Sequence, residues 1–483
     1  MSTSYNEEEP LMINGATHGN IQEKSDEHKK ETKVYRVRFY ILAAATLLGF
    51  SQGWIWNTFG PIQGPAECVF NWSDSTIALM ANWGPISYIV SVVFFSWIMD
   101  VKGLRWAMVI TGALVAGGAG IRCISMEPVT ATWLNHVGLF LNGLAGPVVM
   151  SAPPLISAVW FPPGQRTTAT AVTALSNYYG VSFSFVIGPI LVPYKKSNVT
   201  LNGTVMSHNC LANHSEPNIT TNLHTLTEDI RLYTFVEFAV AAGAFLLLLI
   251  YFPKKPPSPP SITAGCQRTS FVKGLQQLRK RKQFWLVCIA YGICTGAFSG
   301  WGAILDVNLK HFGIDETEAG WIGFYSNLAG SVAGLLFSGI ADYLKRRTKV
   351  VLILILFGAT ASFSWFLLIC LKVLPSSTAC LYISATLGGL FINGAIPLFY
   401  ELAVESTYPI AEGTTTGILT MMNNLGCLIF LLMPMFRELK NSMDKWMNPA
   451  MAAACLVCIP IMLLFRAQYQ RLSIDLIGSK DNS

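Results

Sequence analysis

The chain has 483 residues, of which 52% are apolar and only 12% are Asp, Glu, Lys or Arg. Soluble proteins carry roughly 25% charged residues, so this composition excludes a large soluble enzyme. Its many aromatic residues, with 28 Phe, 16 Tyr and 13 Trp, exclude an unpacked chain. The net charge of +6 does not indicate a nucleic-acid partner, because the Lys and Arg residues stand in short groups between long apolar runs. A multi-pass membrane protein is therefore predicted.

Twelve runs of the sequence are apolar and long enough to cross a bilayer, which takes about 20 residues of helix. The first six, in an N-terminal half at 37–252, lie near residues 37–62, 75–99, 106–125, 132–158, 167–192 and 231–252. After a polar linker at 253–282, the C-terminal half at 283–466 has runs near residues 283–308, 318–341, 349–371, 379–404, 414–436 and 446–466. Residues 1–36 and 467–483 are expected to be tails. The first tail contains no apolar core of a cleavable signal, so the first helix is expected to direct insertion.

The distribution of charge predicts which side of the membrane each loop faces. An even number of spans places both tails on one side, and most of the 33 Lys and Arg residues lie on that side. Positively charged loops stay in the cytosol, so both termini are expected to be cytosolic. The loop at 193–230, on the opposite side, holds four N-glycosylation sequons, at Asn198, Asn202, Asn213 and Asn218. A fifth sequon at Asn71 and a disulfide between Cys68 and Cys210 are left open.

The two halves repeat one another at corresponding positions. Asn142-Gly143 with Pro147 corresponds to Asn393-Gly394 with Pro397, and Gly53-Trp54 corresponds to Gly300-Trp301. Two parallel six-helix halves are typical of the major facilitator architecture, so we predict an all-α membrane protein of this class with twelve transmembrane helices.

The loop from Asp100 to Arg105 resembles the signature of that superfamily between its second and third helices, and Asp342 with Arg346 repeats it. The resemblance implies that the Asp caps a helix end and pairs with Arg, which closes the cytosolic side. We expect Glu405 to join this gate as a partner of the basic loop at 345–349. The alternative is a tight turn with ordinary cytosolic charges.

Three segments resemble solute carrier family 49, the relatives of the feline leukaemia virus subgroup C receptor. They are Trp160–Ala171, Tyr291–Phe298 and Glu405–Thr414. Further segments narrow the resemblance to one branch of the family, namely Trp56–Gln63, Arg122–Ile124, Leu141–Pro147 and Ala319–Phe324. The resemblance implies a lysosomal transporter that uses the proton gradient to export pyridoxine, a form of vitamin B6. Other relatives carry choline and ethanolamine, or have been proposed to carry haem.

The same resemblance implies a substrate site. The family binds a quaternary ammonium group in an aromatic cage made by a Trp of the first helix and a Tyr of the seventh. Trp54 matches the first position, but Ser299 stands at the second. Family Gln positions correspond to Tyr178 and Asn424, and a family Asn is replaced by Cys294. Loss of half the cage favours a flat, neutral, hydroxyl-bearing ligand over choline.

Polar side chains inside the spans are expected to face a central cavity, because exposing them to lipid is costly. Trp54 and Asn57 are three residues apart on one helical face, which gives a ring for stacking beside an amide for hydrogen bonding. The other candidate substrate-binding residues are Asn177, Tyr178, Ser299, Trp301, Asn393 and Asn424. Hydrogen bonding between helices is the alternative role for each of them.

Proton coupling requires a titratable group within the membrane. Glu237 is an acid well inside the sixth span, and Glu401 and His136 are the further candidates. A structural hydrogen bond is the alternative role for Glu237.

The N-terminal tail contains Glu7, Leu11 and Met12, which resemble an acidic dileucine signal for a clathrin adaptor and for sorting to lysosomes. No spacing of residues predicts an enzyme, a metal site or a cofactor. The expected partners are therefore a small-molecule substrate, protons, the lipid bilayer and the adaptor. A nutrient receptor whose tails recruit cytosolic partners is the alternative of a different class.

Overall fold

The apolar runs form long helices because a chain in lipid must satisfy its backbone hydrogen bonds within each segment. The computed structural model describes residues 32–193, 198–201, 204–207, 217–266, 268–303, 305, 309, 316–374, 377–433 and 443–480. The long helices of the N-terminal half are α2 Val37–Trp56, α4 Asp74–Trp97, α5 Leu104–Arg122, α6 Pro128–Trp160, α7 Arg166–Leu191 and α8 Pro217–Ile250. Those of the C-terminal half are α11 Lys282–Ala303, α13 Glu316–Leu344, α14 Thr348–Cys370, α15 Thr378–Thr407, α16 Glu412–Leu432 and α18 Met443–Leu464.

Eleven helices of the described residues are long and apolar enough to cross a membrane. The run predicted at 167–192 is the exception, since α7 has the required length but is not among these eleven helices. It is rich in Thr and Ser, and it packs against α2 and α6 of its own half and α13 of the other half. A helix surrounded by protein tolerates this composition better than a helix that faces lipid.

Two predicted boundaries differ from the structure. The first run, at 37–62, gives α2 and is followed by a separate short helix, α3 Gln63–Phe70. The loop predicted to extend to residue 230 ends earlier, because α8 already begins at Pro217. The chain between α7 and α8 includes an antiparallel hairpin, β1 Asn198–Leu201 and β2 Thr204–Ser207.

The hydrophobic core is divided between the two halves. One cluster of buried residues is built from α2 to α8, and a second is built almost entirely from α11 to α18. The halves meet where α7 packs against α13 and where α4 and α6 pack against α16. Within each half, one glycine allows a close helix crossing: a Cβ on Gly180 would collide with the backbone of α2, and one on Gly426 with the backbone of α11. These glycines occupy equivalent positions of the repeat.

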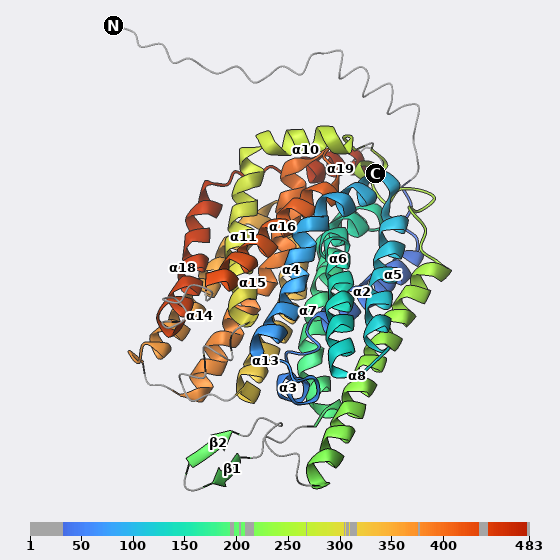
Figure 1. The fold of residues 1–483 in the computed structure, drawn as a ribbon. Coiled ribbons are helices and arrows are strands. Elements are labelled where there is room, and N and C mark those ends of the chain that lie inside the picture. Colours follow the sequence, from blue (N-terminus) through green and yellow to red (C-terminus); the bar gives the residue numbers. More distant parts are fainter. Residues whose placement is uncertain are drawn as a thin grey trace.

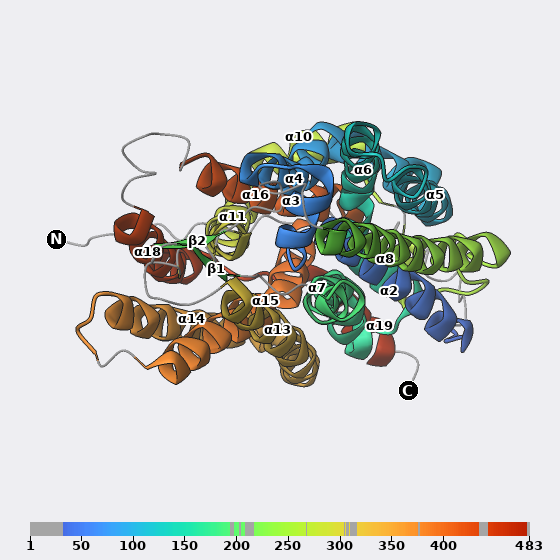
Figure 2. The ribbon, with the colours of Figure 1, turned by 60° about the horizontal axis from the view of Figure 1, so that its bottom comes forward.

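Short elements gather at one end of the bundle, which we call the α19 end (Figure 1). They are α9 Ile262–Gly265, α10 Phe271–Lys280 and α19 Gln470–Lys480, together with the short turns Ile98–Lys102, Pro163–Gln165 and Lys345–Arg347. The Lys33 amide donates to the Pro259 carbonyl at 3.2 Å, so the start of the described chain contacts the linker. The β1–β2 hairpin lies at the opposite end, and the view in Figure 2 separates the two halves.

Candidate functional site

Each half caps a helix of the other half at the α19 end. Asp100 lies in the π-helical turn that ends α4, and its carboxylate accepts hydrogen bonds from the Thr414 amide at 2.8 Å and from the Thr414 hydroxyl. Thr414 belongs to the first turn of α16, where free amides and the helix dipole attract an anion. Asp100 therefore ties the N-terminal half to the C-terminal half.

Asp342, at the end of α13, makes the equivalent contact in the reverse direction. Its carboxylate accepts from the Thr167 amide at 3.2 Å, the Thr168 amide at 2.9 Å and the Thr168 hydroxyl at 2.8 Å. The helix capped here is α7, in the N-terminal half. The internal repeat thus produces two matched caps that close the same end of the bundle.

The arginines predicted to pair with these aspartates lie elsewhere. Arg105 is exposed, and no ion pair within the described part of the chain includes it. Arg346 donates to the Ser473 hydroxyl at 3.1 Å. The helix termini, rather than these arginines, donate the hydrogen bonds that the two aspartates accept in this state.

The segment expected to be a polar tail contributes the central cation of this end. Arg471 of α19 is 1% exposed, and it donates to Glu405 at 3.0 Å and to Glu401 at 2.7 Å. Its third nitrogen lies 3.8 Å from Glu412. Burial opposes the charge on Arg471, but the three carboxylates outweigh burial and raise the pKa of Arg471 above its ordinary value.

This arrangement corrects the predicted partner of Glu405. Glu405 pairs with Arg471 and not with the basic loop at 345–349. Lys349 of that loop instead donates to the Phe465 and Leu463 carbonyls at the end of α18. The predicted pairing was wrong because it treated residues 467–483 as a tail, whereas α19 folds back against α15.

A second residue of α19 reaches the N-terminal half and the linker. Asp475 forms an ion pair with Arg166 at 2.8 Å and accepts from the Thr263 amide at 2.9 Å. Arg166 opens α7, and Thr263 belongs to the linker helix α9. Nearby, Arg268 of the linker makes a bidentate contact with Glu412, at 2.6 Å and 3.0 Å. The α19 helix therefore joins both halves and the linker in one network.

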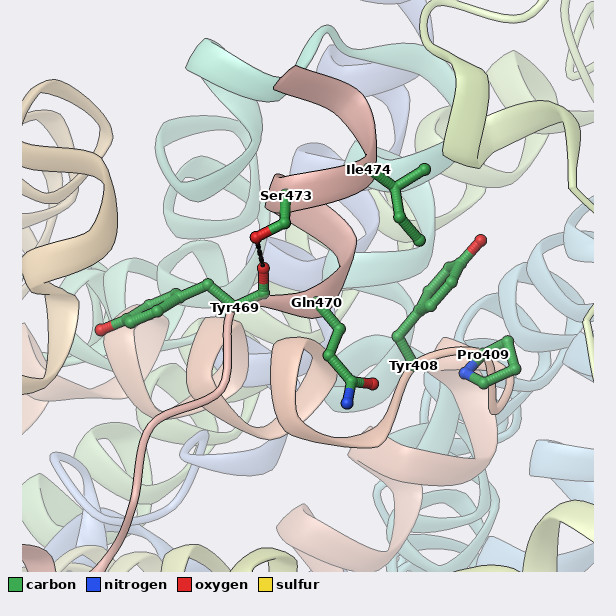
Figure 3. Close-up of a pocket in the computed structure, with 6 residues that line it drawn as sticks. All are labelled: Tyr408, Pro409, Tyr469, Gln470, Ser473 and Ile474. Carbon is green, nitrogen blue, oxygen red and sulfur yellow. Dashed lines mark hydrogen bonds between the residues drawn. The ribbon is translucent and has the colours of Figure 1, made fainter. Parts of the chain in front are cut away.

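Two hollows lie beside this network. A cavity of about 220 Å³ lies between the halves and is lined in part by Thr167, Asp342, Glu401, Glu405 and Asp475. A larger and shallower pocket of about 410 Å³ lies between α19 and the turn after α15, with Tyr408, Tyr469 and Ile474 in its wall (Figure 3). In that wall the Ser473 hydroxyl donates to the Tyr469 carbonyl at 2.7 Å. Both hollows belong to the α19 end rather than to the predicted substrate site.

The predicted site residues of the first helix lie inside the N-terminal half. Trp54 is 2% exposed, donates from Nε1 to the Tyr233 hydroxyl at 3.0 Å, and packs edge-on against Phe183 with ring centroids 4.8 Å apart. Asn57 donates to the Ser184 hydroxyl at 2.7 Å. Both side chains are thus oriented by hydrogen bonds to other helices of the same half.

Glu237 lies one helical turn after Tyr233 and has an arginine partner. Arg122 donates to Oε2 of Glu237 at 3.0 Å, and the Thr58 hydroxyl donates to Oε1 at 2.7 Å. The side chains of Arg122 and Glu237 are both fully buried. In the sequence, Arg122 belongs to a segment that resembles the family, and nothing there indicates a pair with Glu237. A lone arginine at the end of an apolar run was the available signal, and it resembled an ordinary loop charge.

The other two candidates for proton coupling lie apart from Glu237. Glu401 binds Arg471 at the α19 end. His136 is half-buried on α6 and accepts at Nδ1 from the Trp83 indole at 2.9 Å. Of the three candidates, Glu237 is therefore the one that lies near Trp54, since it accepts from Thr58, four residues after Trp54.

Three predicted residues lie near the boundary between the halves. Asn177 of α7 donates to the Gln52 side chain, and Tyr178 beside it packs against the core of the C-terminal half. Asn424 of α16 donates to the Thr420 carbonyl at 2.9 Å and approaches the sulfur of Met150 at 3.9 Å. Relative movement of the halves would change the contacts of Tyr178 and Asn424, whereas the hydrogen bonds of Asn177 lie within the N-terminal half.

The remaining predicted residues belong to the C-terminal half. Trp301 donates to Asn448 at 3.0 Å and packs against Phe363 and Phe366, on helices far from the N-terminal half (Figure 2). Asn393 is fully buried and donates to Asn327 at 3.1 Å. Ser299 is half-buried on α11. The structure does not bring Trp301 and Asn393 together with Trp54.

A hydroxyl cluster that the sequence analysis missed joins the halves nearer their centre. The Tyr88 hydroxyl contacts the hydroxyls of Ser151 and Thr420, and the last two are 3.1 Å apart. The Thr416 hydroxyl donates to the Ser151 carbonyl at 2.7 Å. Tyrosine and threonine hydroxyls inside apolar runs gave no separate signal in the sequence.

The predicted sites on the hairpin side are only partly described. Asn198 begins β1 and Asn218 lies in the first turn of α8, whereas Asn202, Asn213 and Cys210 lie outside the described residues. Cys68 is disulfide-bonded, and nine other described cysteines are free. The sorting residues Glu7, Leu11 and Met12 also lie outside the described residues. The described part of the chain contains no group of three or more potential metal ligands.

Comparison with known proteins agrees with this architecture. The family model of the Major Facilitator Superfamily matches residues 41–431. The solved structure of the transporter FucP in the outward conformation has a TM-score of 0.65 with 18% sequence identity, and it covers 90% of this chain and 100% of FucP. A variant of the same protein, described as the E. coli fucose:proton symporter, has a TM-score of 0.63 with 18% identity and covers 89% and 100%.

Sequence relatives are more specific. Solute carrier family 49 member 4 homolog of Xenopus tropicalis is 35% identical over 451 residues, which cover 92% of this chain and 95% of that protein. Choline/ethanolamine transporter FLVCR1 of Felis catus is 26% identical over 411 residues, which cover 83% of this chain and 68% of that protein.

The fold, the two capped halves and the family match define a membrane transporter of the major facilitator class, not an enzyme. Within that class the chain belongs to solute carrier family 49, in the branch similar to member 4. The predicted fold class and the predicted family are therefore confirmed. A small-molecule substrate and a lipid environment follow from this class.

Proposed function

We propose that this protein exports pyridoxine from the lysosomal lumen to the cytosol, using protons, by alternating access. The observation that carries the proton-dependent part is the fully buried pair of Arg122 and Glu237, one helical turn from the Tyr233 that binds Trp54. Ionisable residues within membrane helices are costly and are kept for functions such as proton relays. The description of FucP as a fucose:proton symporter is compatible with proton coupling in this fold.

The proposed substrate rests on the family resemblance and on the residues around Trp54. An indole ring beside the amide of Asn57 suits a flat ring that carries hydroxyl groups. Choline or ethanolamine is the second candidate, because FLVCR1 of Felis catus is described as a choline/ethanolamine transporter. Ser299 on α11 lacks the aromatic face that a second wall of a cation cage requires. Haem, and a receptor function without transport, remain further alternatives.

In this proposal the α19 end is cytosolic and is closed in the present state. Asp100 and Asp342 each cap a helix of the opposite half, and Arg471 with Asp475 adds α19 to the closure. Release of the substrate to the cytosol requires the contacts of Asp100, Asp342 and Asp475 to separate, because these three join the two halves directly. A closed cytosolic end would leave the site available from the lumen, where loading takes place.

The cellular setting is proposed on sequence grounds. Glu7, Leu11 and Met12 would bind a clathrin adaptor and direct the protein to lysosomes. Asn198, Asn202, Asn213 and Asn218 would carry glycans on the luminal side. Replacing all four by Gln should reduce the mobility shift that a glycosidase produces on a gel, and a shift of unchanged size would contradict this assignment.

The test of the function is uptake by a sorting-defective protein at the cell surface. Substituting Leu11→Ala and Met12→Ala should move the protein to the plasma membrane, where the luminal face meets the medium. Labelled pyridoxine, choline and haem are compared at about pH 5 and about pH 7.5, the range in which buried acids of transporters titrate. Pyridoxine uptake above that of mock-transfected cells, and greater at the lower pH, supports the proposal. Uptake equal to that of mock-transfected cells refutes it.

A further inference from the structure

Arg122 is held in place as strongly as Glu237. Besides its ion pair, it donates from Nε to Asn135 at 2.9 Å, and its guanidinium lies over the Phe59 ring at 5.3 Å. Its remaining terminal nitrogen is buried without a hydrogen-bond partner among the described residues. A buried guanidinium with incomplete hydrogen bonding is costly, so the pair with Glu237 carries most of its stabilisation.

Two links connect this ion pair to α2 and to the segment that directly follows it. The Thr58 hydroxyl, four residues after Trp54, donates to Glu237 at 2.7 Å. The Tyr233 hydroxyl, four residues before Glu237, accepts from the Trp54 indole at 3.0 Å. Residues four apart lie on the same face of a helix, so one face of α8 holds both the carboxylate and the group that orients Trp54.

Few charged or titratable groups act on Glu237. Arg122 and the half-buried thiol of Cys123 face it from α5, and Tyr233 lies on its own helix. The region after α2 contributes the Thr58 hydroxyl, and α6 contributes Asn135 through Arg122. Arg122 is therefore the cation that determines whether Glu237 stays ionised.

We infer that Arg122 is a positioning residue for Glu237 and that Tyr233 couples the charge of this pair to the orientation of the Trp54 ring; this inference rests on the proposed function. With Glu237 ionised, the pair holds α5 against α8, and Tyr233 fixes the indole. When Oε2 of Glu237 takes up a proton from the lumen, the ion pair is lost. The contacts of α8 with Thr58 and Trp54 are then held less firmly. Proton binding and ring binding are thereby coupled through one face of α8.

The transport test uses two variants of the sorting-defective protein. Arg122→Gln should abolish the pH dependence of pyridoxine uptake, because a buried carboxyl without a counter-charge stays neutral across the assay range. Tyr233→Phe should raise KM about tenfold, the effect of losing one buried hydrogen bond, and KM should depend less on pH than in the parent protein.

Matched controls exist on the same helices. Arg231→Gln removes an arginine of α8 with an exposed side chain, which pairs with Glu228 of its own helix. Tyr40→Phe removes another hydrogen bond between α2 and α8, from the Tyr40 hydroxyl to the Leu247 carbonyl at 2.7 Å. Both controls should retain the uptake and the pH dependence of the parent protein.

A second measurement, which needs no substrate, tests the ion pair even if Arg122→Gln does not transport. The thermal unfolding midpoint of the purified full chain should fall more for Arg122→Gln than for the double variant Arg122→Gln/Glu237→Gln, because only the single variant keeps a carboxyl that must take up a proton in order to be buried without its partner. A double variant no more stable than the single variant overturns the pairing.

The outcomes separate the inference from the proposed function. If uptake by the parent protein does not depend on pH, the proton-dependent function and this inference are both refuted. If uptake by the parent protein depends on pH and uptake by Arg122→Gln depends on pH in the same way, the inference is refuted and the proposed function is not. Uptake by Tyr233→Phe with an unchanged KM removes Tyr233 from the coupling.

Discussion

Replacing Arg471 by Gln is expected to open the α19 end. In the closed state this guanidinium lies 2.7 Å from Glu401, 3.0 Å from Glu405 and 3.8 Å from Glu412, and it is 1% exposed. Gln is uncharged and cannot neutralise three carboxylates. The variant therefore leaves negative charges close together in a region with little access to water.

The size of the effect follows from the burial of these groups. Removing one partner of a buried ion pair costs about 3–5 kcal/mol. Arg268 still neutralises Glu412 at 2.6 Å, so the lower part of this range applies, about 3 kcal/mol. Since about 1.4 kcal/mol corresponds to a tenfold change in an equilibrium constant, the ratio of closed to open molecules should fall about 100-fold.

Cysteine labelling measures this shift. Ser151→Cys introduces a thiol at the boundary between the halves, where Ser151 is fully buried and contacts Thr420. Labelling of this thiol from the α19 end, which is cytosolic in the proposed function, should be faster in the Arg471→Gln background. Arg466→Gln, an exposed arginine just before α19, is the matched control. Equal labelling rates in the two backgrounds would refute a role for α19 in the closure.

Three further changes test other parts of the structure. Asp100→Asn should weaken its cap on α16 by about 1–2 kcal/mol and raise the cytosolic labelling rate of the Ser151→Cys thiol, whereas an unchanged rate contradicts a gating role. Trp54→Phe keeps an aromatic ring but loses the donor to Tyr233, so KM for pyridoxine should rise about tenfold; an unchanged KM would show that orientation of the indole is unimportant. Gly180→Ala places a Cβ against the α2 backbone and should cost about 1–3 kcal/mol, seen as a lower unfolding midpoint. The same change at Gly117, whose Cβ would meet open space, is its control, and equal midpoints would contradict the crossing.

The long helices were predictable because hydropathy and length alone define a span. The matched positions of Asp100 and Asp342 were predictable for a different reason, since an internal repeat reveals equivalent residues without any knowledge of their contacts. The repeat does not reveal which residue each aspartate contacts. Those partners, Thr414 and Thr168, lie in the opposite half and far away in the sequence.

The unpredicted parts of the site depend on pairs of residues that only the fold brings together. Arg122 and Glu237 are 115 residues apart, and neither belongs to a pattern that identifies the other. Arg471 stands in a short, weakly apolar segment whose helix gains stability from the carboxylates of α15 and α16. Trp301 matches Trp54 in part, because each indole donates to the last long helix of its own half, but the rings that pack against the two indoles come from different helices of the repeat.

The composition of α7 has a consequence for how the protein is made. This helix is not among those apolar enough to be identified as a span by composition, yet it lies between α2 and α13 and joins the two halves. Its many hydroxyl and amide side chains weaken its partition from the translocon into lipid. Its entry into the bilayer must therefore be assisted by helices already synthesised, with α2 the principal candidate because the two cross closely at Gly180. Substitutions on the α2 face of this crossing should accordingly lower membrane insertion during synthesis before they affect any step of transport.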